Sequence, residues 1–162
     1  MKVYLAGAIE AAPDGGRRWR DDLRPFLENE LGFTVHDPTK LEFNVVPPDE
    51  YALFREWRET DFTRFQETMH RIIKQDLRTI IFDTDYIICN WDQYVEKGGG
   101  TQGELTLAFV YRIPVFMVTQ IPVTQISSWI LGCATQIFSS YESLKSHLKI
   151  LENVRKAKLG TA

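Results

Sequence analysis

The length and composition of the chain are those of an ordinary folded domain. Its 162 residues are enough for one sizeable hydrophobic core, and we expect residues 1–162 to form a single domain. With 44% hydrophobic and 25% charged residues, the composition excludes a disordered or fibrous protein. The chain has 19 Lys and Arg against 22 Asp and Glu, so no basic field favours a nucleic-acid polymer as its partner.

The cysteines and histidines indicate neither a disulfide framework nor a metal site. Cys89 and Cys133 fit no zinc-binding spacing, and the three histidines are scattered along the chain. No apolar run reaches the ~18 residues of a membrane span. The apolar residues 3–9 are too few for a signal peptide. We therefore expect a protein that stays in the reducing cytoplasm and has no membrane partner.

The first forty residues predict a strand, a helix and a second strand. Residues 3–6 are a short apolar run that stops at a loop rich in glycine. Residues 17–31 carry apolar side chains at helical spacing and end at Gly32, and Pro25 predicts a kink within them. Residues 33–36 predict the second strand.

The middle of the chain holds an irregular segment followed by the clearest helix. Residues 41–60 combine two adjacent prolines with aromatic and charged residues, and we interpret them as an insertion that packs over one edge of the fold. A strand is predicted at residues 86–89. Between the insertion and this strand, seven apolar residues follow one helical stripe: Phe62, Phe65, Met69, Ile72, Ile73, Leu77 and Ile80.

The rest of the chain continues this alternation of helices and strands. We expect it to fray from Lys156 onward, as chain ends commonly do. The elements predicted before that point are a helix at 102–111, a strand at 114–118, a short helix at 127–131, a strand at 135–138 and a helix at 141–154.

Short apolar strands that alternate with amphipathic helices are typical of a parallel sheet covered on both faces. We therefore predict an α/β fold, a doubly wound five-stranded parallel sheet with helices on both faces. Ligands of such sheets bind beyond the carboxyl ends of the strands. This points to the loops after Ala6, His36, Cys89 and Val118.

The loop after the first predicted strand combines glycines with arginines. Its glycines allow a ligand to approach the backbone closely, and Arg17 and Arg18 stand at a helix start, where they can hold an anion. The loop matches neither the dinucleotide nor the triphosphate glycine motif. The alternative is a solvated loop without function. From its spacing alone, Trp19 is interpreted as a core residue.

The glycine-rich stretch 98–103 leads from a predicted strand into a helix and ends at Glu104. Two interpretations stay open. In one, Thr101 and Glu104 form a capping box that satisfies the first backbone amides of the helix. In the other, the loop aims Glu104 into the cleft, where a carboxylate can act as a nucleophile on a sugar carbon.

Asp76 occupies an unfavourable local position for an acidic residue. It lies beside the apolar stripe near the end of its helix, where the helix dipole disfavours a carboxylate. Asp83, by contrast, is interpreted as an ordinary solvated carboxylate. A group that contradicts its local preference is a hint of function.

A set of short motifs occurs along the chain in a characteristic order. They are Tyr4-Leu5-Ala6-Gly7-Ala8-Ile9, Trp19-Arg20, Asp37-Pro38, Asp76 with Ile80 and Asp85, Gly100-Thr101-Gln102-Gly103-Glu104-Leu105, Ile113-Pro114-Val115, and Trp129-Ile130 ahead of Ile137-Phe138. This ordered set resembles the nucleoside 2-deoxyribosyltransferase family and its relatives that hydrolyse the N-glycosidic bond of deoxynucleotides. The resemblance covers most of the chain except residues 41–60.

The resemblance implies a flavodoxin-like fold and a double displacement at the anomeric carbon of a sugar. Glu104 matches the nucleophile of the family, Tyr4 the tyrosine that orients nucleophile and sugar, and Asp76 the acid that handles the nucleobase. The implied partners are a small deoxynucleoside or deoxynucleotide and a free nucleobase. No metal and no organic cofactor is implied.

The sequence departs from the family at one position. Many transferases carry a further aspartate six residues before the nucleophile, and Gly98 stands there in this chain. Asp92, on a longer loop, is the nearest replacement. Contacts to the base from Asn90, Trp91 and Tyr94 are the alternative.

The resemblance also bears on the 5′ group of the substrate and on the assembly. Gly15-Gly16-Arg17 resembles the loop of the monophosphate hydrolases, in which an arginine pairs with a phosphate. Ser128 lies where the family contributes residues across a subunit interface, which implies a homodimer or higher homo-oligomer. The implied substrate-binding residues are Gly7, Ile9, Gly16, Arg17, Trp19, Asn90, Asp92, Gly100, Thr101 and Ser128.

Four functions follow, in order of preference. The first is transfer of a deoxyribosyl group from a 2′-deoxynucleoside to an acceptor base, because its motifs cover more of the chain. The second is hydrolysis of 2′-deoxynucleoside 5′-monophosphates at the N-glycosidic bond. The third is a non-catalytic nucleotide-sensing module. The fourth is an interaction protein that docks a partner on the aromatic residues between positions 51 and 57.

Overall fold

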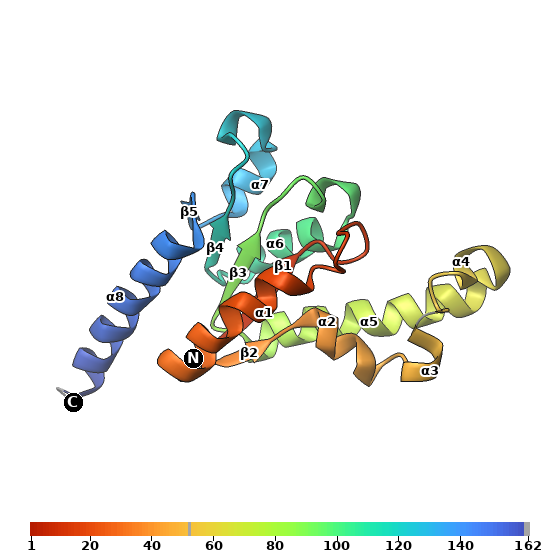
Figure 1. Cartoon of the computed structure of the whole chain (residues 1–162), viewed down its shortest axis with the longest axis horizontal. Coiled ribbons are helices and arrows are strands. Elements are labelled where there is room, and N and C mark those ends of the chain that lie inside the picture. The colour runs from red at the N-terminus through yellow and green to blue at the C-terminus, as the bar shows by residue number, and fades with distance from the viewer. Residues whose placement is uncertain (52, 161–162) are drawn as a thin grey trace.

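Five parallel strands form the centre of the computed structural model (Figure 1), which describes residues 1–51 and 53–160. Ala52, Thr161 and Ala162 lie outside the described residues. The strands lie in the order β2-β1-β3-β4-β5 and every neighbouring pair is parallel, so the predicted flavodoxin-like α/β fold is confirmed. Their bounds are β1 (Lys2–Gly7), β2 (Thr34–His36), β3 (Tyr86–Asn90), β4 (Val115–Val118) and β5 (Gln136–Phe138).

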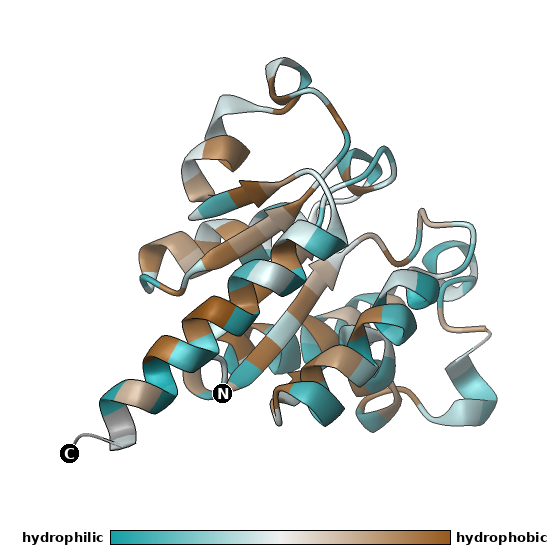
Figure 2. Cartoon of the chain, turned by 60° about the vertical axis from the view of Figure 1, so that its left-hand side comes forward, coloured by the Kyte–Doolittle hydropathy of each residue, from teal (hydrophilic) through white to brown (hydrophobic). Residues whose placement is uncertain are grey.

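Helices cover both faces of the sheet because alternate residues of its strands point in opposite directions. On one face, Val3 and Leu5 pack with α1 (Arg17–Pro25) and α8 (Tyr141–Gly160). On the other, Tyr4 and Ala6 pack with α5 (Phe62–Asp83), α6 (Gly100–Val110) and α7 (Ser128–Cys133). Figure 2 shows brown, apolar residues along the strands, with teal and brown alternating on the helices around them. The functional loops leave this core at the carboxyl ends of β1 and β3.

The first helix changes type where the kink was predicted. Regular α-helix ends at Pro25 and continues as a π-helix over Phe26–Glu30, in which the amide of Leu31 donates to the carbonyl of Phe26. Proline has no amide hydrogen to donate to the preceding turn, so the regular ladder is interrupted there. The wider turn still buries Phe26 and Leu27 in the core.

Residues 38–51 and 53–60 form short helices and turns that pack mainly on α5, and the first of these helices also packs against β1 (Figure 1). Val46 and Phe54 are buried against Ile72 of α5 in a small apolar cluster. That this segment is an insertion stays a prediction. Its elements are α2 (Pro38–Leu41), a 3-10 turn (Glu42–Asn44), α3 (Pro48–Tyr51) and α4 (Trp57–Thr60), and further 3-10 turns occur at Val95–Lys97 and Val123–Gln125.

The apolar stripe predicted on α5 is wrong in its detail. The buried side chains of this helix are Thr68, Ile72, Asp76 and Ile80, which recur at every fourth position. Ile73, from the predicted stripe, is 47% exposed. The helix packs its 68–80 row inward, so part of the apolar row beside it stays in contact with solvent.

The last helix is longer than predicted. Fraying was expected from Lys156 onward, whereas α8 continues to Gly160 and extends beyond the sheet (Figure 1). Glu152 pairs with Arg155 at 2.7 Å and with Lys156 at 3.6 Å. These pairs, three and four residues apart, lie on one helix face and support the final turns.

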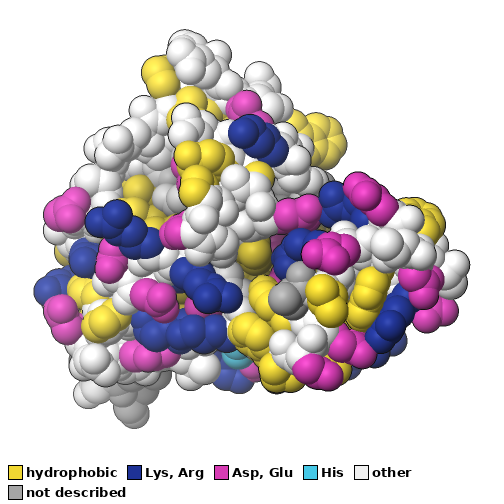
Figure 3. Space-filling view, turned by 45° about the vertical axis from the view of Figure 1, so that its right-hand side comes forward, with side chains coloured by type: hydrophobic (Ala, Val, Ile, Leu, Met, Phe, Trp, Pro, Cys, Tyr) yellow, Lys and Arg dark blue, Asp and Glu magenta, His cyan; other side chains and the backbone are white. Residues whose placement is uncertain are grey.

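The surface carries charges of both signs. Figure 3 shows Lys and Arg interspersed with Asp and Glu over one face of the molecule. Within the described residues, no helix is both long enough and apolar enough to span a lipid bilayer.

Gly16, at the start of α1, gives a test of the fold. Its φ is +70° and an added Cβ would lie 2.1 Å from the carbonyl oxygen of Ala8, so we expect Gly16→Ala to lower the free energy of unfolding by more than ~2 kcal/mol. Gly98→Ala is the control, because a Cβ there meets nothing within 4 Å. Urea unfolding measures both variants, and equal losses would contradict the assigned loop geometry.

Candidate active site

The side chains of Tyr4 and Glu104 meet where β1 packs against α6. Tyr4 is fully buried, and its hydroxyl donates a hydrogen bond of 2.8 Å to Oε1 of Glu104. The alternation of β1 directs Tyr4 toward this face, and Glu104 lies just over one turn into α6. The fold thus joins two residues that are 100 positions apart in sequence.

Glu104 lies at the wall of a cavity of about 760 Å³ between α5 and α6. This volume is within the roughly 300–1,000 Å³ of small-molecule sites. An added Cβ at Gly99, Gly100 or Gly103 would meet nothing within 4 Å, so these glycines leave the approach to the carboxylate open. Apolar walls come from Met69, Ile73, Leu77, Leu107, Val110 and Trp129.

Asp76 of α5 lines the same cavity. Its side chain is only 9% exposed, and Oδ1 is buried without a hydrogen-bond partner. Burial raises the pKa of Asp76 to about 8, and the nearby carboxylates of Glu104 and Glu42 act in the same direction. Asp76 therefore carries a proton at neutral pH and can donate it to a molecule in the cavity.

The charge on Glu104 depends on two opposing effects. Burial raises the pKa of its carboxyl group, while the hydrogen bond from Tyr4 and the positive charge of Arg20 lower it. In the structure burial is the largest influence, and the hydroxyl and the guanidinium are what favour the anion.

The capping-box interpretation of Thr101 and Glu104 is wrong. Helix α6 begins at Gly100, its N-cap is Gly99, and no side chain caps it. Thr101 is buried inside the first turn, and Glu104 points to Tyr4 instead of back to the start of its helix. The local pattern fitted a cap, but the contact with a distant strand decided the orientation of the side chain.

The N-terminus of α1 already holds an anion from the chain itself. Asp14 accepts hydrogen bonds of 2.9 Å from the backbone amides of Gly16 and Arg18, which lower the pKa of its carboxyl group, the bond from Arg18 most. Arg17 is exposed and lines a separate polar cavity of about 330 Å³ with Ile9. The predicted anion contact at the helix amides is therefore taken by Asp14.

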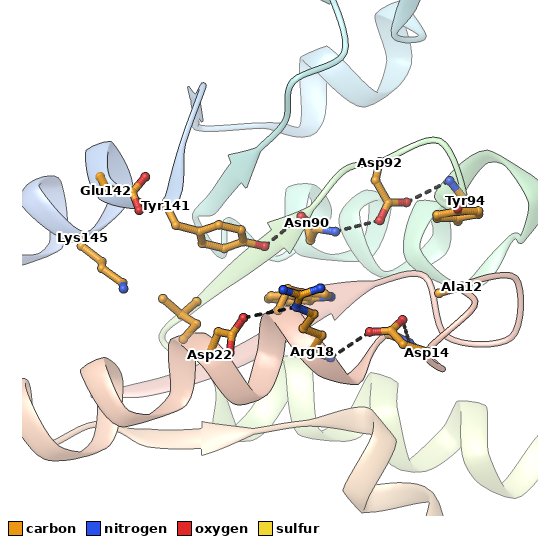
Figure 4. A pocket seen from close by; sticks show the side chains of 13 residues that line it. Ala12, Asp14, Arg18, Asp22, Asn90, Asp92, Tyr94, Tyr141, Glu142 and Lys145 are labelled. Atoms are coloured by element: carbon orange, nitrogen blue, oxygen red, sulfur yellow. Dashed lines mark hydrogen bonds and ion pairs between the residues drawn. The ribbon is translucent and has the colours of Figure 1, made fainter.

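A third cavity, of about 400 Å³, lies between α1 and α8 (Figure 4). Trp19 packs near-parallel to Tyr141 there, at 6.2 Å between ring centroids. Asn90 accepts a hydrogen bond from the Tyr141 hydroxyl and donates one to Asp92. Asp92 also accepts from the amide of Tyr94, so Figure 4 shows a connected row of polar groups.

The residues predicted for the site thus line several separate cavities. Asp76, Glu104 and Gly100 line one cavity, and Tyr4 is buried behind Glu104. The residues predicted for base and 5′-group contacts line other cavities. Trp19, Asn90, Asp92 and Gly16 line the cavity between α1 and α8, and Ile9 and Arg17 the polar one. Gly7 packs against Trp19 and Asn90, Thr101 is buried, and Ser128 is exposed next to Trp129.

Sequence reasoning missed the burial of four charged residues, Arg20, Asp37, Glu42 and Glu152. Arg20 was noted only as part of a motif, and it is 0% exposed. Glu42, inside the predicted insertion, is also buried and accepts hydrogen bonds from Tyr51 at 2.5 Å and Arg55 at 3.4 Å. A buried charge is not visible in a local pattern, because its partners come from other segments. No His, Cys, Asp and Glu side chains gather as a metal site within residues 1–51 and 53–160.

Comparison with known proteins finds solved structures of the same fold. No family model and no curated protein sequence matches the chain. Among solved structures it is similar to a 2-deoxyribosyltransferase from the psychrotolerant bacterium Bacillus psychrosaccharolyticus, with 22% identity over 90% of each chain and a TM-score of 0.56. It is also similar to the CMP N-glycosidase BcmB of Clostridium botulinum, with 17% identity over 93% of this chain and 99% of that one, and a TM-score of 0.52.

A conserved protein from Enterococcus faecalis V583 has the same architecture, with 15% identity over 92% of this chain and 97% of that one, and a TM-score of 0.59. At such identities the likeness establishes the fold. The resemblance drawn from the sequence is confirmed at that level, because a deoxyribosyltransferase and a nucleotide N-glycosidase are among the proteins that share this architecture.

The raised pKa of Asp76 predicts a pH-dependent stability. The folded protein holds this proton up to about pH 8, whereas the unfolded chain loses it near the usual value of 3.8, so stability falls as pH rises between the two. We expect the difference in unfolding free energy, wild type minus Asp76→Asn, to fall by at least ~2 kcal/mol from pH 5 to pH 8.5.

Glu152→Gln is the control for this experiment. A hydrogen bond from Arg155 lowers the pKa of Glu152, so its contribution to stability is lost only in acid and is constant above pH 5. Urea unfolding across the pH range measures both variants. The same pH dependence in both would contradict the assignment to Asp76.

Proposed function

We propose that this protein cleaves the N-glycosidic bond of 2′-deoxynucleosides and transfers the deoxyribosyl group to an acceptor base, with Glu104 as nucleophile. The observation that carries this is that the protonated Asp76 and Glu104 line one cavity, with Glu104 held by the hydroxyl of the buried Tyr4. One carboxyl group available as an anion and one available as an acid are what a displacement at an anomeric carbon needs.

In the first step an oxygen of Glu104 bonds to C1′ of the sugar. The bond from C1′ to the base nitrogen breaks, its electron pair goes to the base, and Asp76 donates a proton to that leaving group. In the second step a nitrogen of the acceptor base bonds to C1′, the ester to Glu104 breaks, and Asp76 takes back the proton that the acceptor loses. A 2-deoxy sugar favours both steps, because no hydroxyl at C2′ withdraws electrons from the positive centre.

The electrostatics support these roles. Asp76, with a pKa of about 8, is an acid at neutral pH. Tyr4 keeps its own proton, because burial and the charges of Glu104 and Asp76 raise its pKa well above 10. Its hydroxyl is therefore a hydrogen-bond donor to Glu104 and orients the attacking oxygen.

Hydrolysis of 2′-deoxynucleoside 5′-monophosphates is the second candidate. It is favoured by the similarity of the fold to a CMP N-glycosidase and by exposed Arg17 beside a polar cavity. The nucleoside reaction is preferred because Asp14 already occupies the backbone amides at the start of α1. A carboxylate at that position repels a phosphate dianion.

A substrate panel distinguishes these functions. Deoxynucleosides and their 5′-monophosphates are incubated with and without a free acceptor base, and the products are separated by chromatography. Exchange of bases on nucleosides supports the transferase. Release of base from monophosphates alone supports the hydrolase, and binding without turnover supports the nucleotide-sensing module.

Glu104→Ala tests the nucleophile. We expect kcat/KM to fall at least about 1,000-fold, because no other group forms the bond to C1′. The variant should stay folded and lose about 1–3 kcal/mol of unfolding free energy, since Glu104 caps no helix but accepts the hydrogen bond of the buried Tyr4 hydroxyl. Glu96→Ala, at an exposed position of the preceding loop, is the control. A normal rate for Glu104→Ala would refute the mechanism.

We further propose that the protein acts as a homo-oligomer in which a second copy covers the cavity. Val110 and Trp129 line the cavity and are 66% and 68% exposed, respectively. Apolar side chains grouped at a cavity are typical of a surface that another molecule covers. Ser128 would then lie at the interface between the two copies.

Val110→Glu should separate the copies and lower activity, because it places a charge in that apolar surface. Light scattering gives the mass in solution, and the base-exchange assay gives kcat/KM. Val154→Glu on α8, 48% exposed, is the control and should change neither. A monomeric wild-type protein with full activity would contradict the oligomer.

A further inference from the structure

Arg20 is a fully buried arginine whose hydrogen bonds go to backbone carbonyls at the end of β1 and in the loop that follows. Its Nε and Nη2 donate to the carbonyl of Leu5 at 3.2 and 3.1 Å, and Nη2 also donates to Gly7 at 3.0 Å. Nη1 donates to Gly16 at 2.6 Å and to Ala8 at 3.4 Å. One side chain thus connects the end of β1 to both ends of the loop that follows it.

These hydrogen bonds take the place of strand pairing along the part of β1 that β2 does not reach. Strand β2 pairs with β1 only through Lys2, Val3 and Tyr4. Beyond that point the carbonyls of Leu5 and Gly7 face the side where β2 has ended, and Arg20 donates to both. The guanidinium therefore satisfies the exposed edge of β1 directly beyond Tyr4, the residue that contacts Glu104.

The loop is built around this side chain. A Cβ at Gly16 would lie 2.5 Å from Nη1 of Arg20 and 2.1 Å from the carbonyl oxygen of Ala8. Only glycine leaves room for the guanidinium at this point, and the φ of +70° also favours glycine. Loop and arginine thus fit each other closely.

The positive charge of Arg20 is only partly neutralised. Asp37 lies 3.7 Å from Nε and is itself buried, but it also pairs with Arg24 at 2.7 Å. It accepts hydrogen bonds from the amide and hydroxyl of Thr39 as well. Arg24 has a second carboxylate partner, Glu28, at 2.9 Å, whereas Arg20 faces Asp37 at 3.7 Å without a hydrogen bond, so its counter-charge is weak.

We propose that Arg20 is a positioning residue for the transfer reaction: it fixes the end of β1 next to Tyr4, and its buried charge keeps Glu104 in the carboxylate form. This inference rests on the proposed function of Glu104 as nucleophile. It assigns to Arg20 a role at a distance, since no contact with the substrate is needed.

The charged and titratable groups around Glu104 make the effect specific. Tyr4, Asp76 and Cys89 are neutral at pH 7, because burial raises the pKa of each. Arg20 lowers the pKa of Glu104, opposing burial. Asp76 is influenced instead by Glu104 and Glu42. A change at Arg20 therefore acts directly on the nucleophile, and Asp76 titrates as before at the pH values where Glu104 is ionised.

The test compares Arg20→Met, Arg20→Lys and Asp37→Asn by the pH dependence of kcat/KM. Without the positive charge the pKa of Glu104 rises, so the acidic limb of Arg20→Met should move to higher pH by at least about 0.5 unit. Arg20→Lys should restore that limb but, with fewer hydrogen bonds, not the full rate. Asp37→Asn removes the counter-charge and should move the limb to lower pH. The basic limb, which reports Asp76, should stay in place in all three.

A direct measurement of the pKa of Glu104 complements the kinetics. NMR titration of 13C-labelled glutamate carboxyls, with Glu104→Gln to assign the signal, reads the pKa of Glu104 directly and needs no turnover. If Arg20→Met does not fold, the shift in Asp37→Asn decides. If the pKa of Glu104 is the same in the variants as in the wild type while kcat/KM at the pH plateau falls, Arg20 has only a structural role and the inference is overturned. A wild-type protein that exchanges no bases would instead refute the proposed function, while the NMR shift would still test the effect of Arg20 on Glu104.

Discussion

Two buried carboxyl groups line one cavity with largely apolar walls, and they cannot both be charged at low cost. Asp76 has no hydrogen-bond partner for its buried oxygen, whereas Glu104 receives the Tyr4 hydroxyl and the field of Arg20. The environments therefore differ, and the proton resides on Asp76. Strand β1, helix α5 and helix α6 must all hold their positions for this difference to persist, so the chemistry depends on the packing of three separate segments.

Much of the architecture was predictable from local pattern. Apolar strands such as residues 86–89 and 114–118 can only be buried between helices, and their alternation with helical segments leaves few topologies. The exceptions have identifiable causes. The apolar row of α5 that includes Ile73 borders a cavity and not the core. Helix α8 continues because Glu152 forms ion pairs with Arg155 and Lys156 in its last turns.

The candidate active site was predictable in part, from the local positions of acidic residues and from the order of motifs and not from the apolar pattern. The stretch before Glu104 and the unfavourable position of Asp76 drew attention to two segments, and the ordered resemblance associated them with Tyr4. Local chemistry alone left two interpretations of Thr101 and Glu104 open, since a capping box and a glycine-rich approach to a carboxylate can have the same sequence. Arg20 and Glu42 were out of reach, because their role comes from partners in distant segments.

The cavities add a spatial argument about the substrate. Loops after β1 and β3 border the hollow that holds Trp19 and Asp92, and that hollow is on the face covered by α1 and α8. Glu104 is on the opposite face, next to α5 and α6. Recognition of a base by Asp92 and attack by Glu104 therefore call for a substrate that reaches over the ends of the strands between them.

The two outer strands of the sheet are only three residues long. Each leaves few free amides and carbonyls along its outer side, and the stretch of β1 that β2 does not cover is closed by a guanidinium. Another polypeptide would find little backbone to pair with on either border. Short margins of this kind protect a sheet from growing by addition of foreign strands, which favours a protein that resists aggregation at high concentration.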